Sequence, residues 1–471
     1  MAQDPDRQAL SEEDIAGTAR YVSLGGAMAA VGGDVSAVND NPAALGLFRR
    51  GELSISFDGA FQRVSSAATD EASYKLFVPQ LSWVANFVNA ESGGGLLRHS
   101  LMLQFHNVRN FQRALSAEST HASSITEVMA DRTNGLGESK LATNDVWYDS
   151  GIGWLSAAGY LDSLILPDPS DSLLWNPAWP LAGGVDNTFY SVESGGVNRY
   201  SVSWGANFSD RLYFGLSLAL QSISYAKTSY YKEKAATAGC NLDMTTRITA
   251  SGIGVGGSVG LIYRPVNAFR MGLGLRSPVW SNLRVSNRTD MKAYGSTYSL
   301  ASPVNSYSIR AWQQPFHVTA GMAAFFSSRG FLSFEYDYQH QIRTRSQNDG
   351  KLRSAIPDVH QLKAGLEVVA QPNLFIRAGY ACRSSFLRQD IVYMPAYEDT
   401  RTDVETLNLR MAHYASVGIG WRTGSWFVDA AYQLRIQQAG LYAHPFQEDP
   451  FELSSLTHRI VLSLGWTPRR R

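Results

Sequence analysis

Hydrophobic and polar residues alternate with a period of two along most of the chain. In the stretch ELSISFDG, Leu53, Ile55 and Phe57 fall on one face, while serines and an aspartate fall on the other. The stretches FLSFEYDYQ, NLFIRAGY, WFVDAAYQLRI and HRIVLSLGW repeat the pattern. Strict alternation is typical of a β-strand with one apolar face, and about fourteen segments have it. They start near residues 52, 74, 98, 197, 211, 243, 268, 305, 329, 358, 373, 405, 424 and 455.

The connections between these segments alternate in length. The short ones are FSDR, RPVNA, SSRG, AQPN and RTGS, and the long ones lie near residues 111–196, 229–242, 284–304, 347–357, 383–404 and 441–454. Transmembrane barrels have short periplasmic turns and long extracellular loops. The sequence therefore predicts an all-β fold, a closed transmembrane antiparallel β-barrel of about 14 strands over residues 51–471, with both termini in the periplasm. A large soluble β-sandwich or propeller is the alternative.

Composition narrows the class of protein. Charged residues make up 17% of the chain and the formal net charge is zero. Because no basic surplus exists to displace counterions, nucleic acid is not an expected partner. No run approaches the roughly 18 apolar residues of a membrane helix. The nine histidines lack HxxxH and HExxH spacing and the cysteines are only two, so we expect no metal site and no cofactor.

Residues 1–50 precede the first alternating segment and differ from it in composition. The stretch GGDVSAVNDNPAALGLFRR is small, apolar and compatible with short helices, and Asn41-Pro42 forces a turn. A barrel of about fourteen strands has a lumen wider than its own side chains fill. We therefore expect residues 1–50 to lie in the lumen as a helical hatch, with small residues such as Gly32, Gly33 and Ala43 against the wall. A periplasmic tail is the alternative.

The segment GTARYVSLGGAMAAVGGDVSAVNDNPAALGLF resembles the N-terminal hatch of the FadL-type family, the long-chain fatty-acid and hydrophobic-compound transporters of the outer membrane. The Asn-Pro-Ala motif of that hatch matches Asn41, Pro42 and Ala43. The likeness continues in YRPVNAFRMGLGLRSP, PFHVTAGMAAFFSSRGFLSFEYDYQ and NLFIRAGYACRSS, and it looks closest to the Bacteroidetes branch. The resemblance implies a plugged barrel with an internal pocket for a hydrophobic ligand, and release sideways through an opening in the wall.

Two regions are candidates for the ligand path. In SGIGVGGSVGLIY, Gly252, Gly254 and Gly256 leave one strand face without side chains, which makes room for the hatch or a ligand. The same segment fits GxGxxG and GxSxG patterns, but no helix follows it, so we expect no enzyme activity. The insert at about 111–196 holds aromatic residues that pack as an outer cap, form an apolar groove or dock a protein partner: Trp147, Trp154, Tyr160, Trp175 and Trp179.

Pro79 lies inside the second segment, SYKLFVPQLSWVANF, although proline has no N–H to donate to a sheet. The outward pattern resumes at Leu81, so we predict a bulge or kink at Pro79 with a local gap to a neighbouring strand, as a candidate lateral exit. A proline just above the membrane is the alternative. Cys240 and Cys382 both fall on the extracellular side, where a disulfide between them is possible.

Several charged residues fall on predicted inward faces, where they pair with one another in the lumen or anchor the hatch or a ligand carboxylate: Glu335, Asp337, Lys363, Glu367, Arg377, Asp429 and Arg435. The pattern as a whole favours a non-enzymatic outer-membrane channel for passive uptake of hydrophobic small molecules such as long-chain fatty acids. Its expected surroundings are membrane lipid and lipopolysaccharide. The alternative is a structural or adaptor barrel subunit of a larger outer-membrane machine for secretion or assembly, bound to a protein partner.

Overall fold

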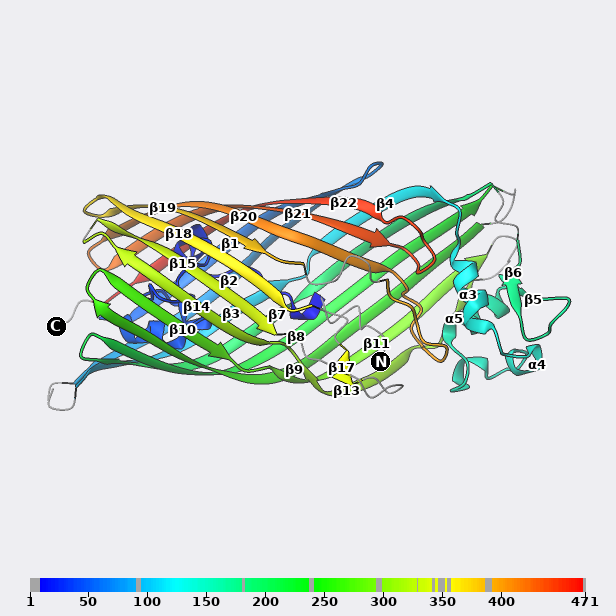
Figure 1. The fold of residues 1–471 in the computed structure, drawn as a ribbon, viewed down its shortest axis with the longest axis horizontal. Helices are drawn as coiled ribbons and strands as arrows, with labels where there is room; N and C mark the ends of the chain where they lie inside the picture. Colours follow the sequence, from blue (N-terminus) through cyan, green and yellow to red (C-terminus); the bar gives the residue numbers. More distant parts are fainter. Residues whose placement is uncertain are drawn as a thin grey trace.

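The wall strands pair antiparallel with their neighbours along the chain, and β1 pairs with β22 to close a cylinder (Figure 1). This computed structural model describes residues 9–89, 95–179, 183–236, 241–293, 299–327, 329–340, 344–345, 352–353, 357–385 and 392–468. Successive fragments that run along the same neighbour, such as β3 with β4 and β10 with β11, count as one strand. The described residues then form fourteen wall strands, which confirms the predicted closed barrel.

The strands of the wall are β1 (Glu52–Ser65), β2 (Asp70–Val88), β3 (Leu96–Asn110), β4 (Arg113–His121), β7 (Val185–Phe208), β8 (Leu212–Ala235), β9 (Asn241–Val266), β10 (Phe269–Arg276), β11 (Trp280–Ala293), β12 (Leu300–Ala301), β13 (Asn305–Gln313), β14 (Phe316–Phe325), β15 (Gly330–His340), β18 (Val359–Gln371), β19 (Leu374–Arg383), β20 (Thr406–Thr423), β21 (Trp426–Tyr442) and β22 (Phe451–Trp466). Two further hairpins are β5 (Ile165–Pro167) with β6 (Trp175–Pro177), and β16 (Thr344–Arg345) with β17 (Leu352–Arg353).

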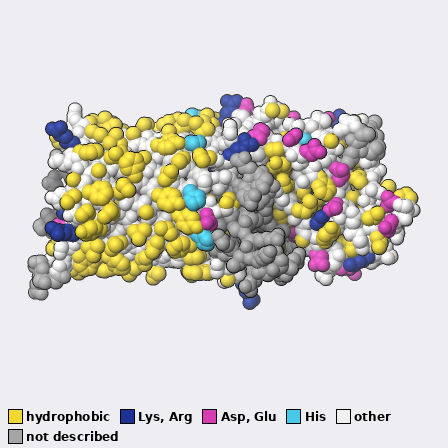
Figure 2. Space-filling model, in the orientation of Figure 1, with side chains coloured by type: hydrophobic (Ala, Val, Ile, Leu, Met, Phe, Trp, Pro, Cys, Tyr) yellow, Lys and Arg dark blue, Asp and Glu magenta, His cyan; other side chains and the backbone are white. Residues whose placement is uncertain are grey.

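The two ends of the barrel differ. We call the end with the short connections the turn end and the opposite end the cap end. Outward apolar side chains form a band over the half of the wall next to the turn end, and charged side chains appear beyond it (Figure 2). About 9–11 residues suffice for a strand to cross the hydrocarbon, whereas β7, β8 and β9 have 24, 24 and 26 residues. The wall therefore extends well beyond the apolar band at the cap end.

Strands extend further than the alternation predicts. β4 pairs with β7 from Arg113↔Glu193 to His121↔Val185, so the insert between strands begins after residue 121 rather than near 111. The predicted long loops 229–242 and 284–304 also hold much strand, because β8 pairs with β9 as far as Lys234↔Asn241 and β11 continues to Ala293. Outside the apolar band the outward residues are polar, so the alternation that marks a membrane strand is absent there.

None of the helices in the described parts of the chain is long and apolar enough to cross a membrane.

Residues 9–50 lie inside the barrel, in the half that carries the apolar band (Figure 1). They contain the helix α2 (Ala19–Ser23) and the 3₁₀ turns η1 (Ala37–Asn39) and η2 (Pro42–Leu47). Their apolar side chains share one cluster with wall residues such as Val84 and Met102. Wall glycines let the segment approach closely. A Cβ added to Gly215 would lie 2.2 Å from the carbonyl carbon of Pro42, and a Cβ added to Gly260 would lie 1.9 Å from Asn41 Oδ1.

A cap covers the other end of the barrel. It contains α3 (Ile125–Thr133), α4 (Glu138–Leu141), η4 (Val146–Tyr148), α5 (Trp154–Leu161) and the β5–β6 hairpin. A side-chain capping box starts α3, in which Ser124 and Glu127 bond each other's backbone. The buried face of these helices joins inward residues of the wall strands in one hydrophobic cluster. The lumen is therefore bounded by residues 9–50 at one end and by the cap at the other.

Candidate functional site

The second wall strand is irregular at Pro79. Ser56 pairs with Gln80 and Asp58 pairs with Phe77, so β2 carries one extra residue opposite Phe57. Such a register shift is a β-bulge, which accommodates a residue that cannot donate to the ladder. The bulge predicted from the sequence at Pro79 is confirmed. The outward pattern resumes as expected, with Leu81 and Trp83 exposed.

The wall separates beside this bulge. β2 and β3 pair from Val88↔Arg98 to Gln80↔His106, and in the described residues their pairing ends there. β3 has its own register shift against β7, between Asn107 and Arg109. Toward the cap end, residues 70–79 pair only with β1 and residues 113–121 only with β7. We call this gap between residues 70–79 and 107–116 the wall opening.

Two polar contacts cross the wall opening. Thr69 Oγ1 donates to the carbonyl oxygen of Ser116 at 2.7 Å and bounds the opening on the cap side. Lys75 Nζ donates to the carbonyl oxygen of Asn110 at 3.1 Å in its middle. Both contacts use a side chain instead of the backbone ladder. The edges of the opening can therefore separate without breaking backbone pairing between the strands.

The wall opening reaches into the apolar band. Tyr74 contacts Phe61 and Phe61 stacks on His458, at the level where the band ends. Leu76 and Pro79 follow Tyr74 toward the turn end, and Leu76 is 86% exposed on the outer surface. Pro79 therefore lies on the turn side of this level, at the height of the apolar band, and its position relative to the membrane stays a prediction.

A cavity of about 50 Å³ lies behind the wall opening, lined by Lys75 and Asn110 from its two edges. Aliphatic lining residues, among them Val64, Leu115 and Leu453, belong to the hydrophobic cluster of the cap. The other side is strongly charged. The charged lining groups are the cations Lys75, Arg109, Arg113 and Arg435 and the carboxylates Asp14 and Glu193. The cavity is therefore amphipathic, with more cations than carboxylates in its lining.

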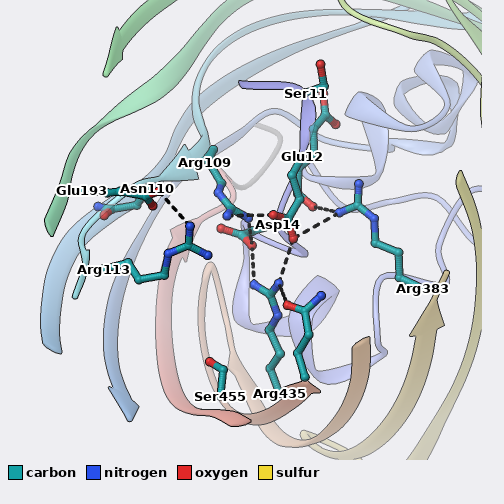
Figure 3. Close-up of polar contacts among 12 residues, drawn as sticks. Ser11, Glu12, Asp14, Arg109, Asn110, Arg113, Glu193, Arg383, Arg435 and Ser455 are labelled. Carbon is teal, nitrogen blue, oxygen red and sulfur yellow. Dashed lines mark hydrogen bonds and ion pairs between the residues drawn. The ribbon is translucent and has the colours of Figure 1, made fainter. Parts of the chain in front are cut away.

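The floor of the cavity is an ion-pair cluster in which residues 11–14 meet the wall (Figure 3). Glu12 lies 2.8 Å from Arg109 and 2.8 Å from Arg435, on strands from opposite ends of the chain. Asp14 contacts the same two guanidinium groups at 3.1 and 3.3 Å. Two arginines thus hold two carboxylates, and the N-terminal segment is fixed to two separate wall strands, β3 and β21.

Glu13 points to another part of the wall. It lies 2.9 Å from Arg199 and 2.8 Å from Arg276. Arg383 donates to the Glu13 carbonyl oxygen at 2.7 Å and Arg459 donates to the Ile15 carbonyl oxygen at 2.7 Å. Consecutive acids therefore engage arginines all around the inner wall.

The ion pairs keep the side chains of Glu12, Glu13 and Asp14 ionised. Burial raises the pKa of Glu12, but Arg109 and Arg435 outweigh it and hold this pKa far below the ordinary value. Burial also opposes ionisation of Glu13, whose pKa is lowered by Arg276 and Arg199. The pKa of Asp14 is lowered against burial by Arg109 and Arg435. All three groups are carboxylates at neutral pH.

We expect the docking of residues 9–18 to persist in mild acid. A carboxyl group with a lowered pKa in the docked state stabilises docking fully above its ordinary pKa, and this is lost only as the pH falls through the lowered value. Hydrogen exchange of these residues, corrected for intrinsic rates, should therefore be unchanged from pH 7 to about pH 5 and should rise only in stronger acid. A marked rise near pH 6 would contradict the assignment.

The predicted hatch motif contacts the inner wall. Asn41 accepts a hydrogen bond from Ala43 N at 3.1 Å and donates to the carbonyl oxygens of Ala29 at 2.8 Å and Leu261 at 3.1 Å. Pro42 begins η2. Gly32 and Gly33 have φ of +62° and +66°, and an added Cβ on Gly32 would lie 2.3 Å from Leu47 Cδ1. The motif thus joins two parts of the segment and touches β9.

The predicted inward charges are buried or, for Asp337 and Arg435, half-buried, and several hold residues 9–50 in place. Glu367 binds Arg20 at 2.9 Å and Arg377 at 2.7 Å, and Arg377 also binds Asp429 at 2.5 Å. Glu335 accepts from the backbone N–H of Ala29 at 2.6 Å and from Lys363 at 2.8 Å. The inward orientation predicted from the alternation is confirmed.

The other predicted site residues lie apart from the cavity. The space in front of Gly254 is filled by Ser281 and Val279, that of Gly256 by Val279 and Pro278, and that of Gly252 by Leu283 and the Asn282 backbone. The five aromatic residues of the insert pack in the cap, where Trp147 contacts Trp154 and Tyr160 contacts Trp175, and Trp179 lies against the same cluster. Cys382 is half-buried and Cys240 lies outside the described residues, so the proposed disulfide stays a prediction.

Sequence reasoning missed most of the cavity. Lys75, Arg109, Arg113 and Glu193 lie in strands whose register is invisible in the alternation. One signal was available, the acidic run Glu12-Glu13-Asp14 at the start of an otherwise small and apolar segment. Three adjacent carboxylates in a segment expected inside a barrel require cations on the wall.

No protein-family model matches the sequence, and none of the curated proteins matches it either. Solved structures do match in fold. The toluene transporter TodX of Pseudomonas putida is 13% identical with a TM-score of 0.56, over 97% of this chain and 100% of TodX. The toluene transporter TbuX of Ralstonia pickettii is 11% identical with a TM-score of 0.54, over 97% of this chain and 99% of its own.

A FadL homologue from Pseudomonas aeruginosa is similar as well, at 12% identity and a TM-score of 0.56, over 97% of this chain and 99% of that chain. At identities this low, the structural similarity establishes a shared fold alone. The FadL-type fold expected from the hatch motif is therefore confirmed, and the Bacteroidetes branch stays a prediction.

Proposed function

We propose that this protein is an outer-membrane channel for passive uptake of amphipathic small molecules with an acidic head and an apolar tail, such as long-chain fatty acids. The single observation that carries the proposal is the amphipathic cavity behind the wall opening. Lys75, whose ammonium group contacts no carboxylate in the described residues, attracts the head, and the tail enters by displacing side chains of the cap cluster, because the cavity of about 50 Å³ is smaller than the ligand. Apolar burial contributes about 25 cal/mol per Å².

The route follows from the same geometry. The cap end faces outside, and the ligand reaches the cavity from there. Residues 9–50 fill the lumen toward the turn end, so the wall opening between β2 and β3 is the exit into the membrane. The fold neighbours named as toluene and hydrocarbon transporters support a hydrophobic ligand, and the acidic head rests on the cavity alone. No step needs an energy source, because the ligand moves from water into hydrocarbon.

Lys75→Met is expected to weaken binding of tetradecanoate about tenfold, through loss of one charge-assisted hydrogen bond. Lys75 contacts the backbone carbonyl of Asn110 and no carboxylate in the described residues, so its removal leaves no carboxylate unpaired in the cavity. Isothermal titration should compare tetradecanoate with tetradecanol, which has the same tail and no charge. The alcohol should bind the two proteins equally.

Lys232→Met is the matched control, because Lys232 is exposed on the outer part of β8. It should bind both ligands as the wild type does. Wild-type protein that binds neither ligand would contradict uptake of such molecules. If the wild type binds the acid and the alcohol equally, the ligand is still hydrophobic, but an acidic head does not contribute to its binding.

The second candidate function, an adaptor subunit of a larger outer-membrane machine, is favoured by one feature. Three residues of the cap expose apolar side chains: Tyr148 at 74%, Leu166 at 51% and Leu173 at 49%. Exposed apolar patches mark binding surfaces in many proteins. Purification from native membranes discriminates the two functions, since a stoichiometric protein partner supports the adaptor and copurified lipid or fatty acid supports the channel.

A further inference from the structure

Pairs of tyrosine and histidine recur on the outer wall where the apolar band ends. Each pair joins a tyrosine hydroxyl to a histidine Nδ1 on the adjacent strand. The pairs are Tyr336–His360 at 2.7 Å, Tyr380–His413 at 2.8 Å and Tyr432–His458 at 2.7 Å. We call them the Tyr–His belt.

The members of the belt lie at one level of the barrel. They join β15 to β18, β19 to β20 and β21 to β22, so a pair occurs at every second strand along six neighbouring strands. Rings continue the belt at both ends, since Tyr338 lies 5.5 Å from His360 and Phe61 lies 6.3 Å from His458. In Figure 2 the histidines of the visible face form a column at the edge of the apolar band.

Each pair leaves one imidazole nitrogen for the surroundings. A tyrosine O–H that donates to Nδ1 selects the tautomer with the proton on Nε2. The Nε2–H group is then a donor held in a fixed orientation by the tyrosine and by ring contacts. His360 and His413 are exposed on the surface. The belt therefore presents a row of oriented donors at the level where lipid headgroups begin.

The charged residues near the belt leave room for an anion. Beyond it toward the cap end, Asp70 is paired with Arg63 and Glu452 with Arg410. Asp358 contacts His340 and Tyr338 at one end of the belt. These carboxylates are already bound to cations or donors, whereas the outward Nε2 atoms of the three pairs contact no protein partner in the described residues.

We propose that the Tyr–His belt binds the phosphate groups of membrane lipids in the leaflet that surrounds the cap side of the apolar band. A phosphate oxygen accepts a stronger hydrogen bond than a neutral ester oxygen does. Tails of the same lipids contact the apolar side chains on the turn side of the belt, such as Val428 and Leu462. The belt would thereby fix the height of the barrel in the membrane and order the lipids along this half of the wall.

The test compares dioleoyl phosphatidic acid with dioleoyl glycerol, which differ only in the phosphate. Native mass spectrometry of the full-length protein measures retention of each lipid. The wild type is expected to retain phosphatidic acid about tenfold more tightly. The variant with His360→Phe, His413→Phe and His458→Phe keeps the rings and is expected to lose this preference.

His99→Phe is the matched control. His99 stacks on Phe87 near the turn end, at 5.1 Å between ring centroids, and belongs to no Tyr–His pair. It should keep the preference. The proposal is overturned if the wild type retains phosphatidic acid and diacylglycerol equally. It is also overturned if the triple variant keeps the preference for phosphatidic acid. If the triple variant does not fold, the three single variants are compared, and full preference in all of them overturns it as well.

Discussion

Deletion of residues 9–48 is expected to raise the flux of small sugars through reconstituted protein at least about tenfold, because a barrel of this size has an open lumen when nothing fills it. Residues 9–50 occupy the half of the lumen inside the apolar band and share its hydrophobic cluster with the wall. The wall should still assemble, since its backbone pairing is closed without them. Buried partners such as Glu367 and Arg377 remain paired with each other. Liposome swelling measures the flux.

Deletion of residues 122–184 is the matched control. His121 pairs with Val185, so a short turn can replace the cap insert. This variant should stay closed to sugars, because residues 9–50 remain in place. Unchanged flux after removal of residues 9–48, with the barrel present at normal levels, would mean that these residues are not the seal.

A single added methyl group tests the same contact. An alanine at Gly215 would place its Cβ 2.2 Å from the backbone of Pro42, whereas at Gly59 an added Cβ meets nothing within 4 Å. Overpacking typically costs about 1–3 kcal/mol. Gly215→Ala should therefore loosen the segment and raise sugar flux part of the way, while Gly59→Ala should not.

The barrel could be predicted from the sequence because the apolar band imposes alternation on every strand that crosses it. Leu53, Ile55 and Phe57 are outward because lipid requires it, and the wall confirms that spacing. The outer ends of β8 and β11 had no such signal, since their outward residues face water. Pro79 was informative for a different reason, because proline removes a backbone donor wherever it stands.

The cavity could not be predicted in the same way. Arg109 and Arg435 meet Glu12 from strands that lie far apart in the chain, and only the closed register of the barrel brings them together. The glycine face at Gly254 illustrates the opposite case. Composition indicates free space there, but Ser281 of β11 and Val279, which precedes β11, fill it. Composition predicted that something packs there, and tertiary contacts decided what.

The second large effect concerns the wall opening. A crosslink between Lys75→Cys and Asn110→Cys is expected to abolish uptake of tetradecanoate, with recovery when the crosslink is cleaved. Lys75 and Asn110 lie on the two edges and touch at 3.1 Å, so a short cleavable bis-maleimide can join cysteines at these positions. Cys240 and Cys382 are first replaced by serine. Uptake is measured in the same variant before crosslinking, after it, and after reduction, which separates closure from the loss of the lysine charge.

Leu81→Cys with Phe105→Cys is the matched control for the crosslink. These residues are register partners on the closed part of β2 and β3, directly on the turn side of the opening. Joining them adds a covalent bond where the ladder is already intact, so uptake should not change. A bond across strands that are already paired restrains no motion. A bond between positions 75 and 110 instead replaces a side-chain contact that must separate for a ligand to pass. Undiminished uptake with the 75–110 crosslink in place would exclude the wall opening as the exit and direct attention to the lumen past residues 9–50.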